Sequence, residues 1–248
     1  MYLYIYDSFL SDKKYSDLLA QIEKRVTDLG IKGRIARLSI LKNMKELITD
    51  GIKSGVQTVV VIGNVQTFAK VINIVAGLEV VLGLIPVEND NKIAKMLGIP
   101  PKLLACDVIA SRIIKKIDLG LINGHFFVGQ AEINDANVLI EYDGYNVRPT
   151  TANNNITIYN FAERCIIPNS TPVDGVLEVV ITPMKSGVFG KKNITGTILP
   201  FSKIKISTEG EEQVSILTDE QVIMKTPAEI SVAPQKLRVI VGPERCFE

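Results

Sequence analysis

The sequence predicts a protein of two parts: an N-terminal three-layer α/β domain with a mostly parallel sheet, and a C-terminal antiparallel β-sandwich. Up to about residue 105, apolar runs typical of strands alternate with runs of helical periodicity, as expected where helices cover a parallel sheet. Beyond about residue 115 no long helical period remains, and short strand-like runs are separated by turn residues. We therefore place one domain at residues 1–105 and the other at 106–248, with the last strand able to return to the first domain.

The first part begins with a strand at residues 1–6. Apolar residues then recur at helical spacing from Tyr15 to Leu29, with Ser11 or Asp12 as the candidate cap and Gly30 as the stop. Residues 56–62 form an almost continuous β-branched run, which is typical of a strand covered on both faces. The remaining expected elements are strands at 35–40 and 80–85 and helices at 44–55, 66–75 and 91–97.

The second part is organised by turn signals. Asn123-Gly124 stands between two apolar runs and predicts a tight hairpin. Further turns are expected at 143–144, 174–175, 186–187 and 209–210, and strands at 138–142, 156–159, 176–182, 204–207, 214–217, 229–232 and 237–241. Strands of this length and spacing predict the sandwich.

Composition excludes several classes of protein. The 248 residues carry 28 basic and 27 acidic side chains, so no basic field favours binding to nucleic acid. Three cysteines, Cys106, Cys165 and Cys246, lie far apart and indicate neither a disulfide framework nor a zinc site. No secretory signal is visible at the start. We expect a cytoplasmic protein in a reducing compartment, without a metal site of its own.

Two loops could carry chemistry, because ligands of an open parallel sheet bind beyond the carboxyl ends of its strands. The first, 63–67, follows a buried strand and opens a helix, where backbone N–H groups favour a phosphate and Thr67 offers a hydroxyl. The same segment also fits an ordinary strand-to-helix turn. The second loop, 86–91, follows the next strand, and its Asn and Asp residues could simply cap the following helix.

An ordered series of motifs resembles the diacylglycerol kinase catalytic fold, the group of lipid kinases that includes bacterial diacylglycerol kinases and sphingosine kinases. That family carries Gly-Gly-Asp-Gly-Thr where this chain has Gly63-Asn-Val-Gln-Thr67, followed at the expected spacing by Asn73 and Gly77. The other matching segments are 83–86, 88–92, 97–100, 117–120, 123–127, 167–178, 226–227 and 236–241. The resemblance implies an ATP-dependent lipid kinase fold with a nucleotide site at Gly63, Asn64, Thr67, Asn89 and Asn91.

The departures from the family pattern fall where the chemistry is expected. Val65 replaces the Asp of the glycine-rich loop, and Asn64 and Gln66 replace the glycines beside it. Glycines allow the backbone to approach a phosphate closely, and bulkier residues hinder that approach. In the second loop, residues 88–90 (Glu-Asn-Asp) replace Gly-Thr-Gly, and Lys92 replaces an Asp. The altered loops predict that ordinary transfer of phosphate from ATP is lost or feeble.

One catalytic candidate survives. The resemblance places Asp219 where the family has its proposed general base, the group that takes the proton from the lipid hydroxyl. A general base needs hydrogen-bond reach to that proton, and a solvated turn between strands is the alternative for Asp219. His125 is the only histidine, and its position beside Phe126 and Phe127 favours packing over catalysis.

Three hypotheses follow from these observations. The first is a catalytically degenerate pseudokinase that binds a lipid, a nucleotide or a partner. The second is an active ATP-dependent lipid kinase that uses ATP and Mg²⁺ and phosphorylates a lipid hydroxyl. The third is a structural or oligomeric role for the sandwich. The partners left open are a lipid ligand, a peripheral membrane contact and a homodimer, with no nucleic acid.

Overall fold

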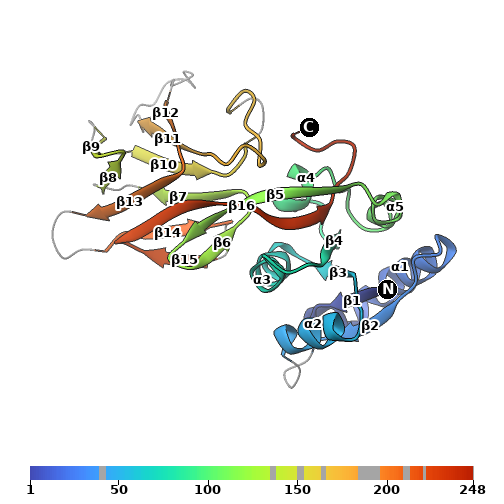
Figure 1. The fold of residues 1–248 in the computed structure, drawn as a ribbon. Helices are drawn as coiled ribbons and strands as arrows, with labels where there is room; N and C mark the ends of the chain where they lie inside the picture. The colour runs from blue at the N-terminus through green and yellow to red at the C-terminus, as the bar shows by residue number, and fades with distance from the viewer. Residues whose placement is uncertain are drawn as a thin grey trace. The chain divides into compact units, whose positions relative to one another are not determined.

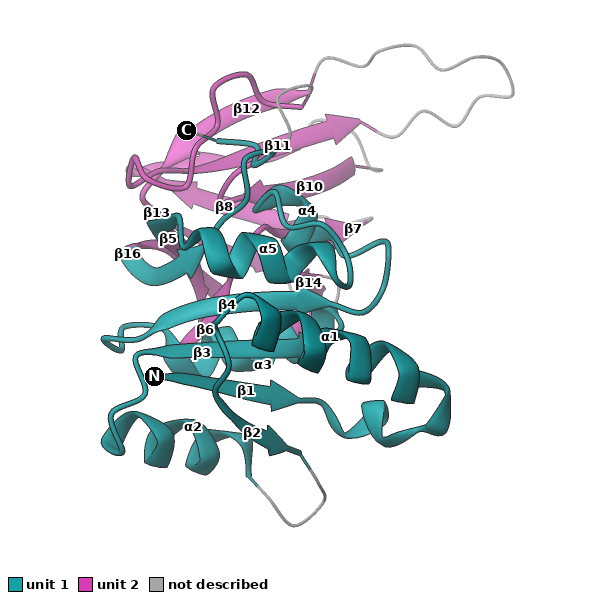
Figure 2. Cartoon of the chain, turned by 90° about the vertical axis from the view of Figure 1, so that its right-hand side faces the viewer, with its two compact units in different colours: residues 1–117, 235–248 teal, residues 118–234 magenta. Residues whose placement is uncertain are grey.

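The computed structural model describes residues 1–38, 43–134, 138–149, 154–162, 166–183, 196–208, 213–219 and 222–247. The chain forms two compact units, one of residues 1–117 with 235–248 and the other of residues 118–234 (Figure 2). It passes from the first unit to the second within β5 (Ile114–Ile122) and returns within β16 (Ala228–Ile240). The sequence placed the boundary at 105/106, and the structure divides the chain at 117/118. Cys165, the turns expected at 186–187 and 209–210, and the end of the strand expected at 35–40 lie outside the described residues.

The first unit is built on a parallel sheet in the order β2-β1-β3-β4 (Figure 1). These strands are β1 (Tyr2–Tyr6), β2 (Arg34–Arg37), β3 (Thr58–Gly63) and β4 (Val81–Pro86). Every residue of β3 and β4 is buried, as the β-branched run predicted. Arg238 and Val239 of β16 pair in parallel with β4, so the last strand does return to this unit.

Helices cover both faces of the sheet, since α1 packs against α5 and α2 against α3 (Figure 2). They are α1 (Ser16–Asp28), α2 (Met44–Lys53), α3 (Val65–Val75), α4 (Lys92–Met96) and α5 (Leu104–Ser111), preceded by the 3₁₀ turns η1 (Ser8–Ser11) and η2 (Lys13–Tyr15). In the described part, none of them combines the length and apolar character that a membrane-spanning segment requires. The expected cap of α1 was wrong, because the Asp12 carboxylate accepts from the Lys14 N–H and caps η2 instead.

The second unit contains two sheets with an apolar core of residues drawn from both. One sheet is antiparallel, in the order β12-β11-β10-β7-β14-β15. In the other sheet, β13 lies between β16 and β8, and β9 lies beyond β8. The β5–β6 hairpin pairs with β16. The strands are β6 (His125–Phe127), β7 (Gln130–Asn134), β8 (Val138–Tyr142), β9 (Tyr145–Val147), β10 (Asn154–Tyr159), β11 (Leu177–Pro183), β12 (Thr197–Phe201), β13 (Lys203–Thr208), β14 (Ser215–Thr218) and β15 (Val222–Lys225). The predicted α/β part and all-β part are both confirmed.

Tight turns join neighbouring strands as their sequences predicted. Asn123 and Gly124 have φ of 45° and 86°, the double left-handed conformation of a two-residue hairpin between β5 and β6. One prediction was wrong: residues 229–232 and 237–241 are not two strands, because β16 runs through both. Its first half pairs antiparallel with β13 and its second half parallel with β4, so the polar residues between the two apolar runs are strand and not turn.

Candidate functional site

The carboxyl ends of the four parallel strands form one edge of the first unit. β1 lies between β2 and β3. The chain leaves β1 through α1 and reaches β2 on one side, whereas the neighbour on the other side is β3. This is the topological switch point at which open α/β sheets bind ligands. Asp7 follows β1 directly, and its N–H donates to the Ile62 carbonyl at 3.2 Å, which fixes the two strand ends together.

The predicted phosphate loop is closed by its own side chains. Asn64 is the N-cap of α3, and its Oδ1 accepts from the Thr67 N–H at 3.0 Å. Thr67 is fully buried, and its Oγ1 lies 2.9 Å from Asn64 Oδ1. A Cβ on Gly63 would lie 2.6 Å from Thr67 Oγ1, so the glycine is required by this packing. Asn64 therefore caps the start of α3 with a side chain of the loop itself.

Asp7 is the residue that sequence reasoning missed. The Thr67 hydroxyl donates to Asp7 Oδ2. A hydroxyl has one proton to donate, and the charged carboxylate is a stronger acceptor than the Asn64 amide oxygen. Asp7 Oδ1 in turn accepts from the Ser8 hydroxyl at 3.1 Å and the Phe9 N–H at 3.4 Å. A fixed carboxylate thus touches the first turn of α3, and an acid directly after a buried strand was the only signal for it.

The second loop brings one predicted residue into the interior and leaves the other outside. Asn89 is exposed, as are Glu88 and Asp90. Asn91 is 3% exposed and caps α4 by accepting from the Ala94 N–H at 3.0 Å. Because the Ala94 N–H needs an acceptor, the amide atom that faces it is the oxygen of Asn91. The buried Nδ2 of the same amide is left without a hydrogen-bond partner. A buried donor without an acceptor is rare in proteins and is satisfied by a ligand or a water.

Asp219 lies in the second unit, at a turn between β14 and β15, and it is 8% exposed. Its carboxylate accepts from the N–H groups of Val128, Gly129 and Gln130 at 2.7, 2.8 and 3.1 Å. Its own N–H donates to the Gln130 carbonyl at 2.8 Å. Asp219, the predicted general base, therefore also holds the turn between β6 and β7 in place.

A second carboxyl in this unit has an unusual environment. Glu178 of β11 is 8% exposed, and the Ser170 hydroxyl donates to its Oε2 at 3.3 Å. Burial raises the pKa of Glu178 to about 7, against the smaller opposing effect of the Ser170 hydrogen bond. Sequence gave no reason to expect this, because a Glu in an alternating strand is ordinarily solvated. For His125, burial lowers the pKa, in keeping with a packing role.

Comparisons with known proteins agree with the resemblance of the motifs. Residues 2–122 match the model of the diacylglycerol kinase catalytic domain. A diacylglycerol kinase from Bacillus subtilis is 35% identical over 77 residues, which are 29% of this chain and 25% of the relative, so this match spans a quarter of the length of that protein.

A solved structure described as a diacylglycerol kinase from Bacillus anthracis str. Sterne has the same fold. It superposes with a TM-score of 0.78 at 20% identity, covering 98% of this chain and 97% of that one. The two comparisons and the motifs agree: residues 2–122 are similar to the diacylglycerol kinase catalytic domain, and the chain as a whole has the fold of this solved structure.

Proposed function

We propose that this lipid-kinase-like protein is a pseudokinase, in which transfer of phosphate from ATP to a lipid hydroxyl is lost or strongly impaired. The observation that carries the proposal is the contact between Asp7 and Thr67. It puts a fixed negative charge at the helix start where backbone N–H groups would otherwise attract a phosphate.

The electrostatic consequence is large enough to matter. Two unit charges about 4 Å apart interact by about 1 kcal/mol in bulk water and about 4 kcal/mol at the effective dielectric of a protein surface. A nucleotide phosphate placed against the first turn of α3 would meet Asp7 at that kind of range. Exposed Glu88 and Asp90, which follow the strand end next to Gly63, add charge of the same sign.

Magnesium fits this edge poorly. Mg²⁺ in kinases is held by one or two carboxylates together with the substrate phosphates. Asp7 already accepts from the Ser8 hydroxyl, the Phe9 N–H and the Thr67 hydroxyl.

Isothermal titration with MgATP tests the proposal. We expect no binding by the wild-type protein up to millimolar ATP, and an affinity at least about fivefold higher in Asp7→Asn, which keeps the shape but removes the charge. Asp50→Asn, an exposed acid at the end of α2, is the matched control and should change nothing. Micromolar binding by the wild type that Asp7→Asn does not improve and Thr67→Arg abolishes would overturn the proposal.

The active kinase remains the second candidate, and Asn91 favours it. The unsatisfied Nδ2 of Asn91 would be explained by a phosphate oxygen or another acceptor of a retained ligand. Transfer of radiolabelled phosphate from ATP to diacylglycerol in mixed micelles tests this candidate. Turnover by the wild type that is lost in Asn91→Ser would establish activity, and no turnover over hours at high enzyme concentration supports the pseudokinase.

A further inference from the structure

Residues 166–176 of the second unit form a strap that precedes β11 and is held to the rest of the unit at two points. The first point is Asp118 of β5. The Asp118 N–H donates to the Pro172 carbonyl at 2.6 Å, and the Gly175 N–H donates to Asp118 Oδ2 at 2.8 Å. Asp118 is 1% exposed, so water has little access to these bonds, and the later part of the strap is firmly attached to β5.

The second point of attachment is the buried hydroxyl of Ser170. It donates to Oε2 of Glu178 in β11 at 3.3 Å. The same oxygen accepts from the N–H of Ala162, which precedes the strap, at 3.1 Å. Ser170 therefore joins three parts of the chain, and its bond to β11 is made to a carboxyl group, which can ionise.

Glu178 lies on the outer face of its sheet. Leu177 and Val179, the residues on either side of it, belong to the apolar core, and side chains alternate between the two faces of a strand. The cross-strand neighbours of Glu178 are Tyr159 of β10 and Pro200 of β12. A glutamate on an outer face is ordinarily solvated, but this one is buried, and the strap covers it through Ser170.

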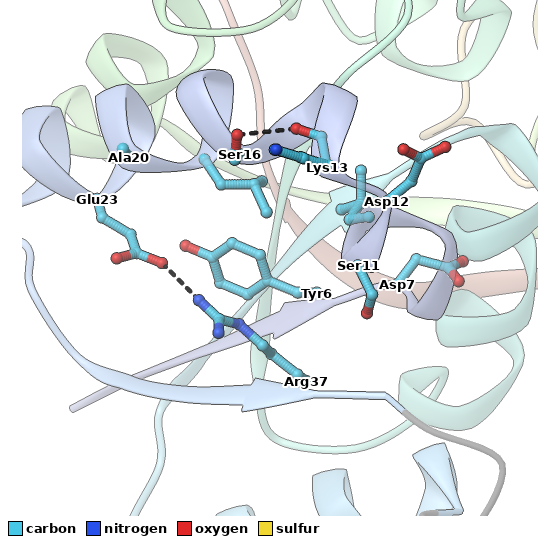
Figure 3. A pocket seen from close by; sticks show the side chains of 11 residues that line it. Tyr6, Asp7, Ser11, Asp12, Lys13, Ser16, Ala20, Glu23 and Arg37 are labelled. Atoms are coloured by element: carbon cyan, nitrogen blue, oxygen red, sulfur yellow. Dashed lines mark hydrogen bonds and ion pairs between the residues drawn. The ribbon is translucent and has the colours of Figure 1, made fainter.

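The charge around this carboxyl opposes its ionisation. Glu23, which lines a cavity of the first unit, shows the usual arrangement, because it accepts from Arg37 Nη2 at 3.2 Å (Figure 3). Around Glu178, the charged group that acts on it among the described residues is Asp174 of the strap, which is negative. Burial raises the pKa of Glu178, Asp174 raises it further, and the Ser170 hydrogen bond opposes both. The carboxyl is therefore stable here as the neutral acid.

We propose that a proton controls the strap: the contact between Ser170 and Glu178 is closed while Glu178 is protonated and opens when Glu178 loses its proton, with the Asp118 contact kept. The proton passes to solvent and one hydrogen bond breaks. Opening lets water reach the carboxylate, which burial otherwise denies it. A folded pKa of about 7 against 4.5 for a solvated glutamate means that ionisation favours the open strap by a factor on the order of 10².

Hydrogen exchange of single backbone amides, followed by NMR, tests the proposal. Each rate is divided by the intrinsic rate at the same pH, so that the remaining change reports opening. We expect the protection of the Ala162 amide, which Ser170 holds, to fall at least about tenfold between about pH 5.5 and 8.5, with its midpoint near 7. The Gly175 amide, which Asp118 holds, is the internal control and should keep its protection.

Three substitutions locate the proton. Glu178→Gln keeps the shape but cannot ionise, so the Ala162 amide should stay protected at every pH. Asp174→Asn keeps the oxygen that accepts from the Val176 N–H at 3.0 Å and removes the charge, so the midpoint should move to lower pH. Asp143→Asn removes an exposed acid from a turn in the other sheet and, as the matched control, should leave the midpoint unchanged.

Ser170→Ala removes the contact itself and should leave the Ala162 amide weakly protected at every pH. The proposal is overturned if the wild-type Ala162 amide keeps its protection up to about pH 8.5, or if the loss persists in Glu178→Gln. An unchanged midpoint in Asp174→Asn, or a parallel loss at the Gly175 amide, which would show a general loosening of the unit, also overturns it. None of these results depends on whether ATP binds.

Discussion

Replacement of Asp219 by alanine should destabilise the second unit strongly, because one carboxylate holds three backbone N–H groups. Val128 and Gly129 are buried, so water cannot replace the carboxylate at their amides without rearrangement. A buried donor left without its partner costs about 1–3 kcal/mol, which makes about 2–6 kcal/mol for the two buried amides of Val128 and Gly129. Asp219 also has a φ of 45°, a conformation in which alanine is strained by about 1 kcal/mol.

Asp143→Ala separates the two contributions. Asp143 has a φ of 46° but is exposed at the turn between β8 and β9, so its replacement introduces the backbone strain without the loss of a buried clamp. Urea unfolding followed by far-UV circular dichroism is the assay, since the chain has no tryptophan. An Asp219→Ala variant within about 1 kcal/mol of Asp143→Ala would refute the clamp. If the clamp holds, loss of activity in Asp219→Ala does not by itself identify a general base.

Three further predictions follow from the buried polar groups. Burial raises the folded pKa of Glu178 from 4.5 to about 7 and so favours its neutral form. The free energy of unfolding should therefore fall as the pH rises from about 4.5 to 7. Glu178→Gln should flatten this part of the pH profile of thermal unfolding. Asn64→Ala removes the cap of α3 and should lower the free energy of unfolding in urea by about 1 kcal/mol. Asn43→Ala, the matched cap removal at α2, should have the same effect. Unchanged stability in both variants would contradict the capping argument. Asn91→Ser keeps a capping oxygen but removes the unsatisfied donor, so the free energy of unfolding should change by less than about 1 kcal/mol, and a larger loss would show that the amide has a partner.

The fold was predictable because its signals are local. The β-branched run of β3 and the Asn123-Gly124 turn each specify one conformation through neighbouring residues. β16 was split in the prediction because its polar middle resembles a turn, and Gln235 there does have a left-handed φ of 51°. The pairing of its two ends with different strands makes it one strand all the same. β15 was missed because a short edge strand has no strong pattern of its own.

The candidate site was predictable in position but not in chemistry. The loop at 63–67 and the capping role of Asn91 follow from helix-start signals in the sequence. The contact between Asp7 and Thr67 joins residues 60 positions apart, and the clamp of Asp219 on Gly129 joins residues 90 apart. Pairings over such separations depend on strand order, which a single sequence does not display.

The discontinuity of the first unit has a consequence for the order in which the chain folds. β4 is made early in synthesis, but its neighbour in β16 follows the whole of residues 118–234. Until then the backbone of Val81 and Leu82 presents an open strand edge, which is prone to pair with other chains. A nascent chain stalled before residue 235 should therefore aggregate or recruit chaperones, and a synthetic peptide of residues 235–248 should compete for that edge.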